Sequence, residues 1–369
     1  MINVVIKKRL LVLSAFLTAL LIFISGCHAG SSTTSGGSPS AAISTSPARL
    51  AFITQPVGSQ AGTSLNTQPV VAIQDANGNL VANSSLPVKL TISSGSGADE
   101  AVLLGPSTIN AAQGLAAFKN LSITQVGANY TLTAASGKLT AAISMPFAIT
   151  PGQPSKLIFT VQPSGGTAGL PFATAPEVRV QDRFGNTVTS YAGPVSLNLI
   201  YNAGPSGASI LGTPTVLATD GVARFTGIAI NKTYPEYKLA ATSGSLNAAI
   251  SSTFAISAGT PVKLEFTIQT AGAKAGTAFE TQPKVAVEDS YDNVVTSSRA
   301  SISVVLNPET AANGAALSGT ATLIAEGGMG GLAVFTDLSI DKVGTGYTLT
   351  ASSEGLASAT SAPFDVLAP

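Results

Sequence analysis

Apolar and polar residues alternate in three similar stretches of the chain, and each stretch ends in turn residues. In the second stretch, Val178 and Val180 alternate with polar residues, and Asp182, Gly185 and Asn186 follow directly. A period of two is typical of a half-buried strand. Aspartate accepts hydrogen bonds from nearby backbone amides, while glycine and asparagine tolerate the positive φ of a tight turn. The pattern predicts a strand, a hairpin turn stabilised by these three residues, and a second strand.

The same turn recurs in the other two stretches, at Asp75, Gly78 and Asn79 and at Asp289 and Asn293. The three aspartates Asp75, Asp182 and Asp289 are evenly spaced along the chain. Their interval is too long for a solenoid repeat and suits one domain per copy. The expected domains are residues 47–152, 153–259 and 260–369, called domains 1, 2 and 3 below.

Each repeat shows about seven segments of strand-like alternation separated by turn signals, and no sustained helical period follows Cys27. We therefore expect an all-β protein of three tandem immunoglobulin-like antiparallel β-sandwiches. Phenylalanines mark matching positions in the repeats, and the interval from Phe225 to Phe335 is longer than that from Phe118 to Phe225. The difference predicts a three-residue insertion in the third repeat, in the glycine-rich segment 327–331.

Later motifs in each repeat carry a family resemblance. Tyrosines at three matching positions look like the tyrosine corner of immunoglobulin-like folds, namely Tyr130, Tyr237 and Tyr347. Together with the Val-x-Val-x-Asp hairpin motif and the Gly-x-Ala-x-Phe segments 114–118 and 221–225, they are similar to the bacterial Ig-like domains of intimin and invasin adhesins. The resemblance covers nearly all of residues 47–369 and implies the fold. Such modules serve as stalks, spacers, adhesin tips and enzyme appendages, so host-receptor binding is not carried over.

Residues 1–26 are expected to be a lipoprotein signal peptide. Basic residues 7–9 precede the apolar run 10–24, which is shorter than the roughly 20 residues that span a bilayer. The sequence Ile24-Ser25-Gly26-Cys27 resembles the bacterial lipobox, which implies cleavage before Cys27 and lipid on its thiol. An uncleaved anchor or an ordinary signal peptide is the alternative. Residues 27–46 are rich in Ser, Thr and Gly and predict a flexible tether.

The residues available for catalysis are few. His28 is the only histidine and Cys27 the only cysteine, which excludes Ser-His-Asp sites and His/Cys metal clusters in the domains. The recurring aspartates lack a second recurring carboxylate of the kind a glycosidase needs. We therefore expect no enzyme activity and no cofactor.

Calcium is the alternative interpretation of the turn residues. Asp75, Asn77 and Asn79 place side-chain oxygens at alternating positions, as calcium loops do. The third copy shifts this pattern to Asp289 and Asp292. A structural calcium ion at the joints between domains is thus a second hypothesis beside turn stabilisation.

Charge and aromatic residues bear on the partners. Domain 3 contains 11 acidic and 5 basic residues, which argues against nucleic acid and leaves a solubilising surface or a cationic partner. Domain 2 contains Tyr191, Tyr201 and Tyr234, a residue type enriched in binding hot spots, so these form a candidate patch for a surface glycan or protein ligand. Nothing in the sequence indicates an oligomer.

The preferred hypothesis is a non-catalytic, exported protein, lipid-anchored to the cell envelope at the outer membrane or cell surface. It would act as a stalk or adhesion-type module, with the membrane contacted through the lipid on Cys27. The alternatives are a carbohydrate- or matrix-binding accessory lipoprotein and an appendage of a polysaccharide-processing system.

Overall fold

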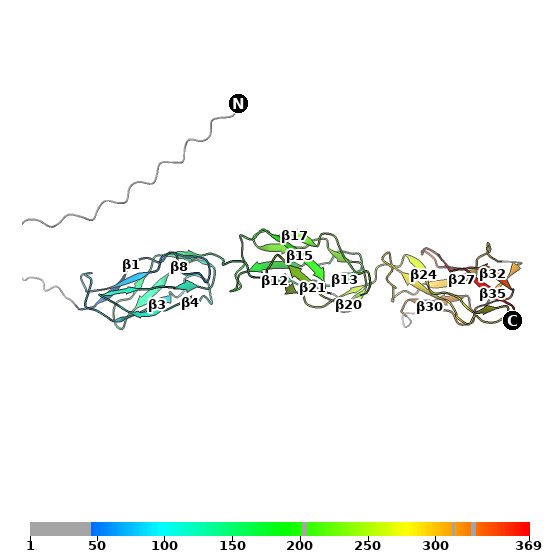
Figure 1. Cartoon of the computed structure of the whole chain (residues 1–369), viewed down its shortest axis with the longest axis horizontal. Helices are drawn as coiled ribbons and strands as arrows, with labels where there is room; N and C mark the ends of the chain where they lie inside the picture. The colour runs from blue at the N-terminus through cyan, green and yellow to red at the C-terminus, as the bar shows by residue number, and fades with distance from the viewer. Residues whose placement is uncertain (1–45, 201–204, 312–313, 326–329) are drawn as a thin grey trace, which may run out of the picture. The chain divides into compact units, whose positions relative to one another are not determined.

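The computed structural model describes residues 46–200, 205–311, 314–325 and 330–369 (Figure 1). Contacts group Thr45–Pro369 into one unit. Strands and turns make up the regular structure of the described residues, with no α-helix among them, so the predicted all-β class is confirmed. The described residues contain no helix that could span a membrane.

Domain 1 is built from short strands that form two facing layers. One layer has the order β1-β2-β6, the other β10-β9-β3-β5, and the pairs β11-β8 and β4-β7 complete the domain. Its strands are β1 (Arg49–Thr54), β2 (Val70–Gln74), β3 (Pro87–Ile92), β4 (Leu103–Leu104), β5 (Thr108–Asn110), β6 (Leu115–Ala117), β7 (Ser122–Ile123), β8 (Gly127–Tyr130), β9 (Leu132–Ala135), β10 (Ala142–Ile143) and β11 (Phe147–Ile149).

Domain 2 repeats this plan and adds one short strand, β13, which pairs in parallel with β23. Its sheets have the orders β12-β14-β18, β17-β15-β21-β22, β13-β23-β20 and β16-β19. The strands are β12 (Lys156–Val161), β13 (Gly166–Thr167), β14 (Glu177–Gln181), β15 (Pro194–Leu199), β16 (Ile210–Leu211), β17 (Thr215–Leu217), β18 (Val222–Arg224), β19 (Ala229–Ile230), β20 (Tyr234–Tyr237), β21 (Leu239–Thr242), β22 (Ala249–Ile250) and β23 (Phe254–Ser257).

Domain 3 has the same sheet orders as domain 2, in the form β24-β26-β30, β29-β27-β33-β34, β25-β35-β32 and β28-β31. The strands are β24 (Lys263–Ile268), β25 (Ala273–Lys274), β26 (Lys284–Glu288), β27 (Ser301–Leu306), β28 (Leu317–Ser318), β29 (Thr322–Ile324), β30 (Leu332–Val334), β31 (Ser339–Ile340), β32 (Gly344–Tyr347), β33 (Leu349–Ser352), β34 (Ala359–Thr360) and β35 (Phe364–Leu367).

The domains contain more strands than the roughly seven segments that alternation predicts. Each of the last two predicted segments of a repeat is split into two short strands, because the strand that it pairs with changes along its length. In domain 2, β21 pairs with β15 and β22, whereas β20, just before it, pairs with β23. A register shift between Tyr234 and Tyr237 accompanies this change. Apolar alternation does not reveal such a change of partner.

The predicted insertion in the third repeat is confirmed by the strand positions. β29 follows β17 at the same interval that separates the hairpin aspartates, whereas β30 follows β18 at the longer interval that separates Phe225 from Phe335. The extra residues therefore lie between β29 and β30. The segment proposed for them, 327–331, is only partly within the described residues.

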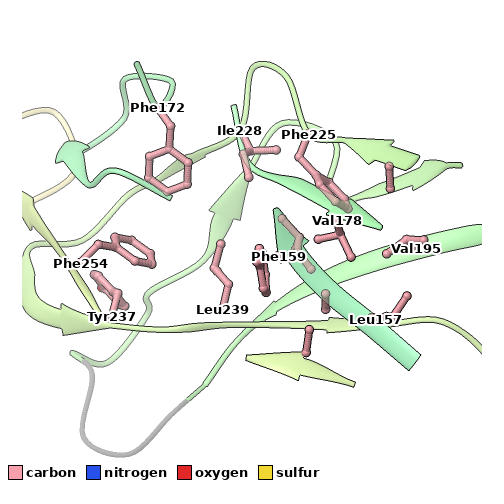
Figure 2. Close-up of a cluster of buried hydrophobic side chains, with 14 of the residues drawn as sticks. Leu157, Phe159, Phe172, Val178, Val195, Phe225, Ile228, Tyr237, Leu239 and Phe254 are labelled. Carbon is pink, nitrogen blue, oxygen red and sulfur yellow. The ribbon is translucent and has the colours of Figure 1, made fainter. Parts of the chain in front are cut away.

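Each domain has its own hydrophobic core, formed where the inward faces of its layers meet. In domain 2, Val178 and Val180 of β14 are fully buried, whereas Arg179 between them is exposed. Phe225, Leu239 and the other side chains of this core converge between the layers (Figure 2). The alternation that predicted the strand thus also determines which of its residues face the core.

The tyrosine-corner prediction is also confirmed. The hydroxyl of Tyr130 donates to the backbone oxygen of Gln125 at 3.0 Å, five residues upstream. Tyr237 and Tyr347 make the equivalent bonds at 3.1 and 3.4 Å. The backbone hydrogen bond satisfies the one polar atom of a large buried ring, which would otherwise be costly to bury.

Candidate functional site

The aspartate of each hairpin binds the backbone of its own turn. Oδ1 of Asp182 accepts the N–H groups of Phe184 and Asn186 at 2.9 and 3.0 Å. Asp75 and Asp289 accept the same two amides of their turns at 2.8–3.0 Å. This geometry holds the turn closed, as expected for an aspartate that begins a turn.

In domains 2 and 3 the same aspartate also binds the last residue of the preceding domain, which we call the linker glycine. Oδ2 of Asp182 accepts the N–H of Gly152 at 2.9 Å, and Oδ2 of Asp289 accepts that of Gly259 at 2.7 Å. Both carboxyls are 1% exposed. The hairpin therefore fixes the direction in which the chain enters each of these domains.

The asparagine at the end of each of these hairpins reaches across to the preceding domain. Asn186 donates from Nδ2 to the backbone oxygen of Thr124 at 2.8 Å, and its Oδ1 accepts the N–H of Val126 at 3.0 Å. Asn293 makes the equivalent pair of bonds. Its Nδ2 donates to the backbone oxygen of Asn231 at 2.8 Å, and its Oδ1 accepts the N–H of Thr233 at 3.0 Å. We call the contacts around Asn186, between domains 1 and 2, the first joint, and those around Asn293, between domains 2 and 3, the second joint.

An aromatic ring adds an apolar contact to each joint. Phe184 packs against the core of domain 1, close to Gly62, and Tyr291 lies close to Gly169 of domain 2. At the first joint, the guanidinium of Arg183 lies 4.5 Å from the Phe184 ring centroid and donates to the Gly62 oxygen at 3.0 Å. The glycines leave room for the rings.

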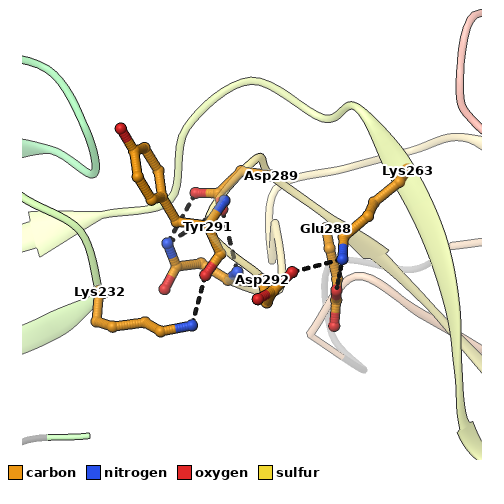
Figure 3. A network of polar contacts seen from close by, with 7 residues as sticks. Lys232, Lys263, Glu288, Asp289, Tyr291 and Asp292 are labelled. Carbon is orange, nitrogen blue, oxygen red and sulfur yellow. Dashed lines mark hydrogen bonds and ion pairs between the residues drawn. The ribbon is translucent and has the colours of Figure 1, made fainter. Parts of the chain in front are cut away.

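The second joint contains additional charged contacts (Figure 3). Lys232 of domain 2 donates to the backbone oxygen of Tyr291. Within domain 3, Nζ of Lys263 lies 2.5 Å from Asp292 and 3.4 Å from Glu288. The hydrogen bond between Lys263 and Asp292 raises the pKa of the ammonium and lowers the pKa of the carboxyl.

Hydrogen bonding keeps the second-joint aspartate charged. Burial by itself raises the pKa of the Asp289 carboxyl, but the bonds from the Gly259 amide and the hairpin outweigh burial and hold this pKa below its usual value of 3.8. A carboxyl whose pKa is lower in the folded than in the unfolded state stabilises the fold at pH values above its unfolded-state pKa. This contribution is lost as the pH falls through the folded-state pKa.

Replacing Gly169 with alanine should loosen the second joint. Gly169 has φ 78°, and a Cβ there would overlap the Tyr291 ring. The matching Gly276 has φ 74°, but a Cβ there meets nothing within 4 Å. Both variants carry the strain of positive φ, roughly 1 kcal/mol, so only Gly169→Ala should disturb the joint.

The measurement is the distance distribution between spin labels at Leu217→Cys and Ile324→Cys, in a Cys27→Ser background. We expect a broader distribution for Gly169→Ala and an unchanged one for Gly276→Ala. Equal broadening in the two variants would show that ring packing on the glycine does not hold the joint.

The candidate aromatic patch of domain 2 is not assembled by the described residues. The Tyr191 hydroxyl lies 2.5 Å from Ser243 Oγ, just beyond the end of β21. The Tyr234 ring packs on Tyr237, before β21 begins, with centroids 5.1 Å apart. The two rings therefore lie roughly 20 Å apart along the strands, and both contact the core. Tyr201 lies outside the described residues.

The calcium candidates have protein partners at most of their oxygens. Besides its turn amides, Asp75 accepts Nδ2 of Asn79 at 3.1 Å, and Asp292 pairs with Lys263. Asn77 is exposed. Among the described residues, no three or more His, Cys, Asp or Glu side chains are grouped so that they could hold a metal ion. Cys27, the predicted lipidation site, lies outside the described residues.

The contacts of Asn186 and Asn293 with the preceding domain are what sequence reasoning missed. Asn186 and Asn293 were predicted only as turn residues. The available signal was the aromatic at the third hairpin position, Phe184 or Tyr291, where domain 1 has Asn77. An aromatic ring in a turn that otherwise favours small polar residues indicates a contact beyond the turn.

Comparison with known proteins gives matches only among solved structures. No protein-family model matches the chain, and no curated protein matches it. The Escherichia coli adhesin FdeC is 15% identical, with 87% of this chain and 96% of that chain covered and a TM-score of 0.33. Invasin, a bacterial integrin-binding protein, is 14% identical, with 85% and 59% covered and a TM-score of 0.29. The chain thus spans about three-fifths of that invasin structure.

Proposed function

We propose that this chain is a non-catalytic, lipid-anchored protein of the cell envelope that presents its three immunoglobulin-like domains as an adhesion-type surface module. The joints support the presentation of the three domains as one module, and the lipobox-like sequence before Cys27 supports the anchor. Each joint ties together a linker glycine, a hairpin and the preceding domain through hydrogen bonds and one aromatic ring. Contacts of this kind restrict the motion of one domain against the next, and such motion is the default for linked domains.

The chemistry of the chain supports a role in presentation. Its single histidine and single cysteine both precede the domains. The recurring aspartates bind backbone amides that hold turns and joints in place. These side chains stabilise the array, and a ligand would be bound by its outer surfaces.

The carbohydrate-binding alternative requires exposed aromatic rings that a sugar can stack on. Tyr191 and Tyr234 are only partly exposed, because both pack against the core of domain 2. We therefore favour the adhesion-type module. Sharp binding on a glycan array that is lost in Tyr191→Ala would reverse this preference.

The anchor is tested by cell fractionation with a radiolabelled fatty acid, comparing wild type with Cys27→Ala. We expect the wild type to carry label and to sediment with membranes, because multiple acyl chains anchor a protein stably. Cys27→Ala should be unlabelled and released into the soluble fraction. Ser32→Ala is the matched control. Unchanged membrane association in Cys27→Ala would contradict lipid anchoring.

The surface role is tested on the same cells by protease treatment from outside. Domain 3 of the wild type should be cleaved in intact cells, while a cytoplasmic marker stays intact. Cells that express the chain should also adhere to a host-cell or matrix surface more than cells that lack it. Full protection of domain 3 in intact cells would contradict a surface module.

A further inference from the structure

We propose that Asn186 and Asn293 occupy the place of an inter-domain cation, so that both joints are held without a divalent ion. This inference rests on the geometry of the joints and is independent of the proposed function. It bears on the calcium hypothesis for the hairpin residues, because an asparagine amide would fill the position of the ion.

Oxygen atoms of two domains converge on each asparagine amide. Nδ2 of Asn186 lies 2.8 Å from the Thr124 oxygen of domain 1 and 2.8 Å from Oδ2 of Asp182 in domain 2. Nδ2 of Asn293 lies 2.8 Å from the Asn231 oxygen and 2.9 Å from Oδ2 of Asp289. A carboxylate and a backbone carbonyl are also the oxygens that calcium prefers.

The asparagine amide satisfies these oxygens by hydrogen bonding. Its NH₂ group donates one hydrogen to the carboxylate and one to the carbonyl, and its own oxygen accepts an amide of the preceding domain. Asn186 and Asn293 are only 8% and 4% exposed, so water competes little for these bonds. The position between the oxygens is thus filled by a group that belongs to the chain.

The chain contains matching positions that lack the joint. Asn79 of domain 1 is exposed, and its Nδ2 bonds to Asp75 within its own hairpin. Val343 of domain 3 corresponds to Val126 and Thr233 and is 53% exposed. These residues serve as internal controls.

The test is hydrogen exchange of the full chain at single-residue resolution. The amides of Val126 and Thr233 should exchange more slowly than that of Val343, and equally slowly in calcium and in a chelator. Asn186→Ala should accelerate exchange at Val126 about tenfold or more and leave Thr233 unchanged. Asn79→Ala should change neither amide. Slow exchange in the core of the mutated domain confirms that each variant is folded.

Two results would overturn the proposal. One is faster exchange at Val126 or Thr233 of the wild type when the chelator is added, because the joint would then need an ion. The other is unchanged exchange at Val126 in Asn186→Ala. Asn293→Ala repeats the test at the second joint, with Thr233 as the affected amide and Val126 as the control.

A gain of metal dependence provides the complementary test. Asn186→Asp removes the donating NH₂ group and leaves carboxylate and carbonyl oxygens facing one another. Exchange at Val126 should then be fast in the chelator and slow again in millimolar calcium. If calcium does not slow it, the site does not suit a cation, and the proposed replacement is refuted.

Discussion

Phe225→Ala is expected to lower the free energy of unfolding of domain 2 by about 3–5 kcal/mol. Phe225 is 0% exposed and belongs to the domain 2 core (Figure 2). Truncation removes the transfer free energy of the ring and leaves a cavity that the surrounding strands fill only in part. The loss is a large part of the stability of a domain of this size.

The effect should be confined to domain 2, because the three cores are separate. Denaturant unfolding, followed by hydrogen exchange of amides in each core, measures the three domains individually. Ile250→Ala is the control, since Ile250 is 63% exposed. Equal destabilisation of domains 1 and 3 would show that the repeats do not unfold as separate units.

Asp289→Ala is expected to destabilise domain 3 by about 3–5 kcal/mol, since each buried donor left unpaired costs about 1–3 kcal/mol. The carboxyl accepts hydrogen bonds from Tyr291, from the backbone and side chain of Asn293, and from the linker glycine Gly259. Alanine leaves these donors without their acceptor. Both the hairpin and the second joint should therefore weaken.

Asp75→Ala is the matched comparison, because Asp75 stabilises the same turn without a bond to a linker glycine. Its destabilisation of domain 1, measured in the same denaturation experiment, should be smaller. Equal losses in the two variants would assign the whole effect to the turn and none to the joint. Thr233 exchange should also accelerate in Asp289→Ala and stay unchanged in Asp75→Ala.

Particular residues show how far the sequence predicts this fold. Val178 and Val180 predict a strand with one buried face, which the structure has. The spacing of Phe225 and Phe335 places the insertion between the correct strands. These features are local, or repeat at a fixed spacing, and can therefore be read along the chain.

The all-β class, the hairpins, the tyrosine corners and the position of the insertion follow from the sequence alone. Alternation, turn chemistry and repeat spacing are properties of neighbouring or equivalent residues. The contacts of Asn186 and Asn293 with another domain, and the separation of Tyr191 from Tyr234, become visible only in the folded chain. The physical reason is that an amide or a ring has the same local preferences in a turn or a strand whether or not a distant surface packs against it. Its partner is chosen by the folding of segments about 60 residues away.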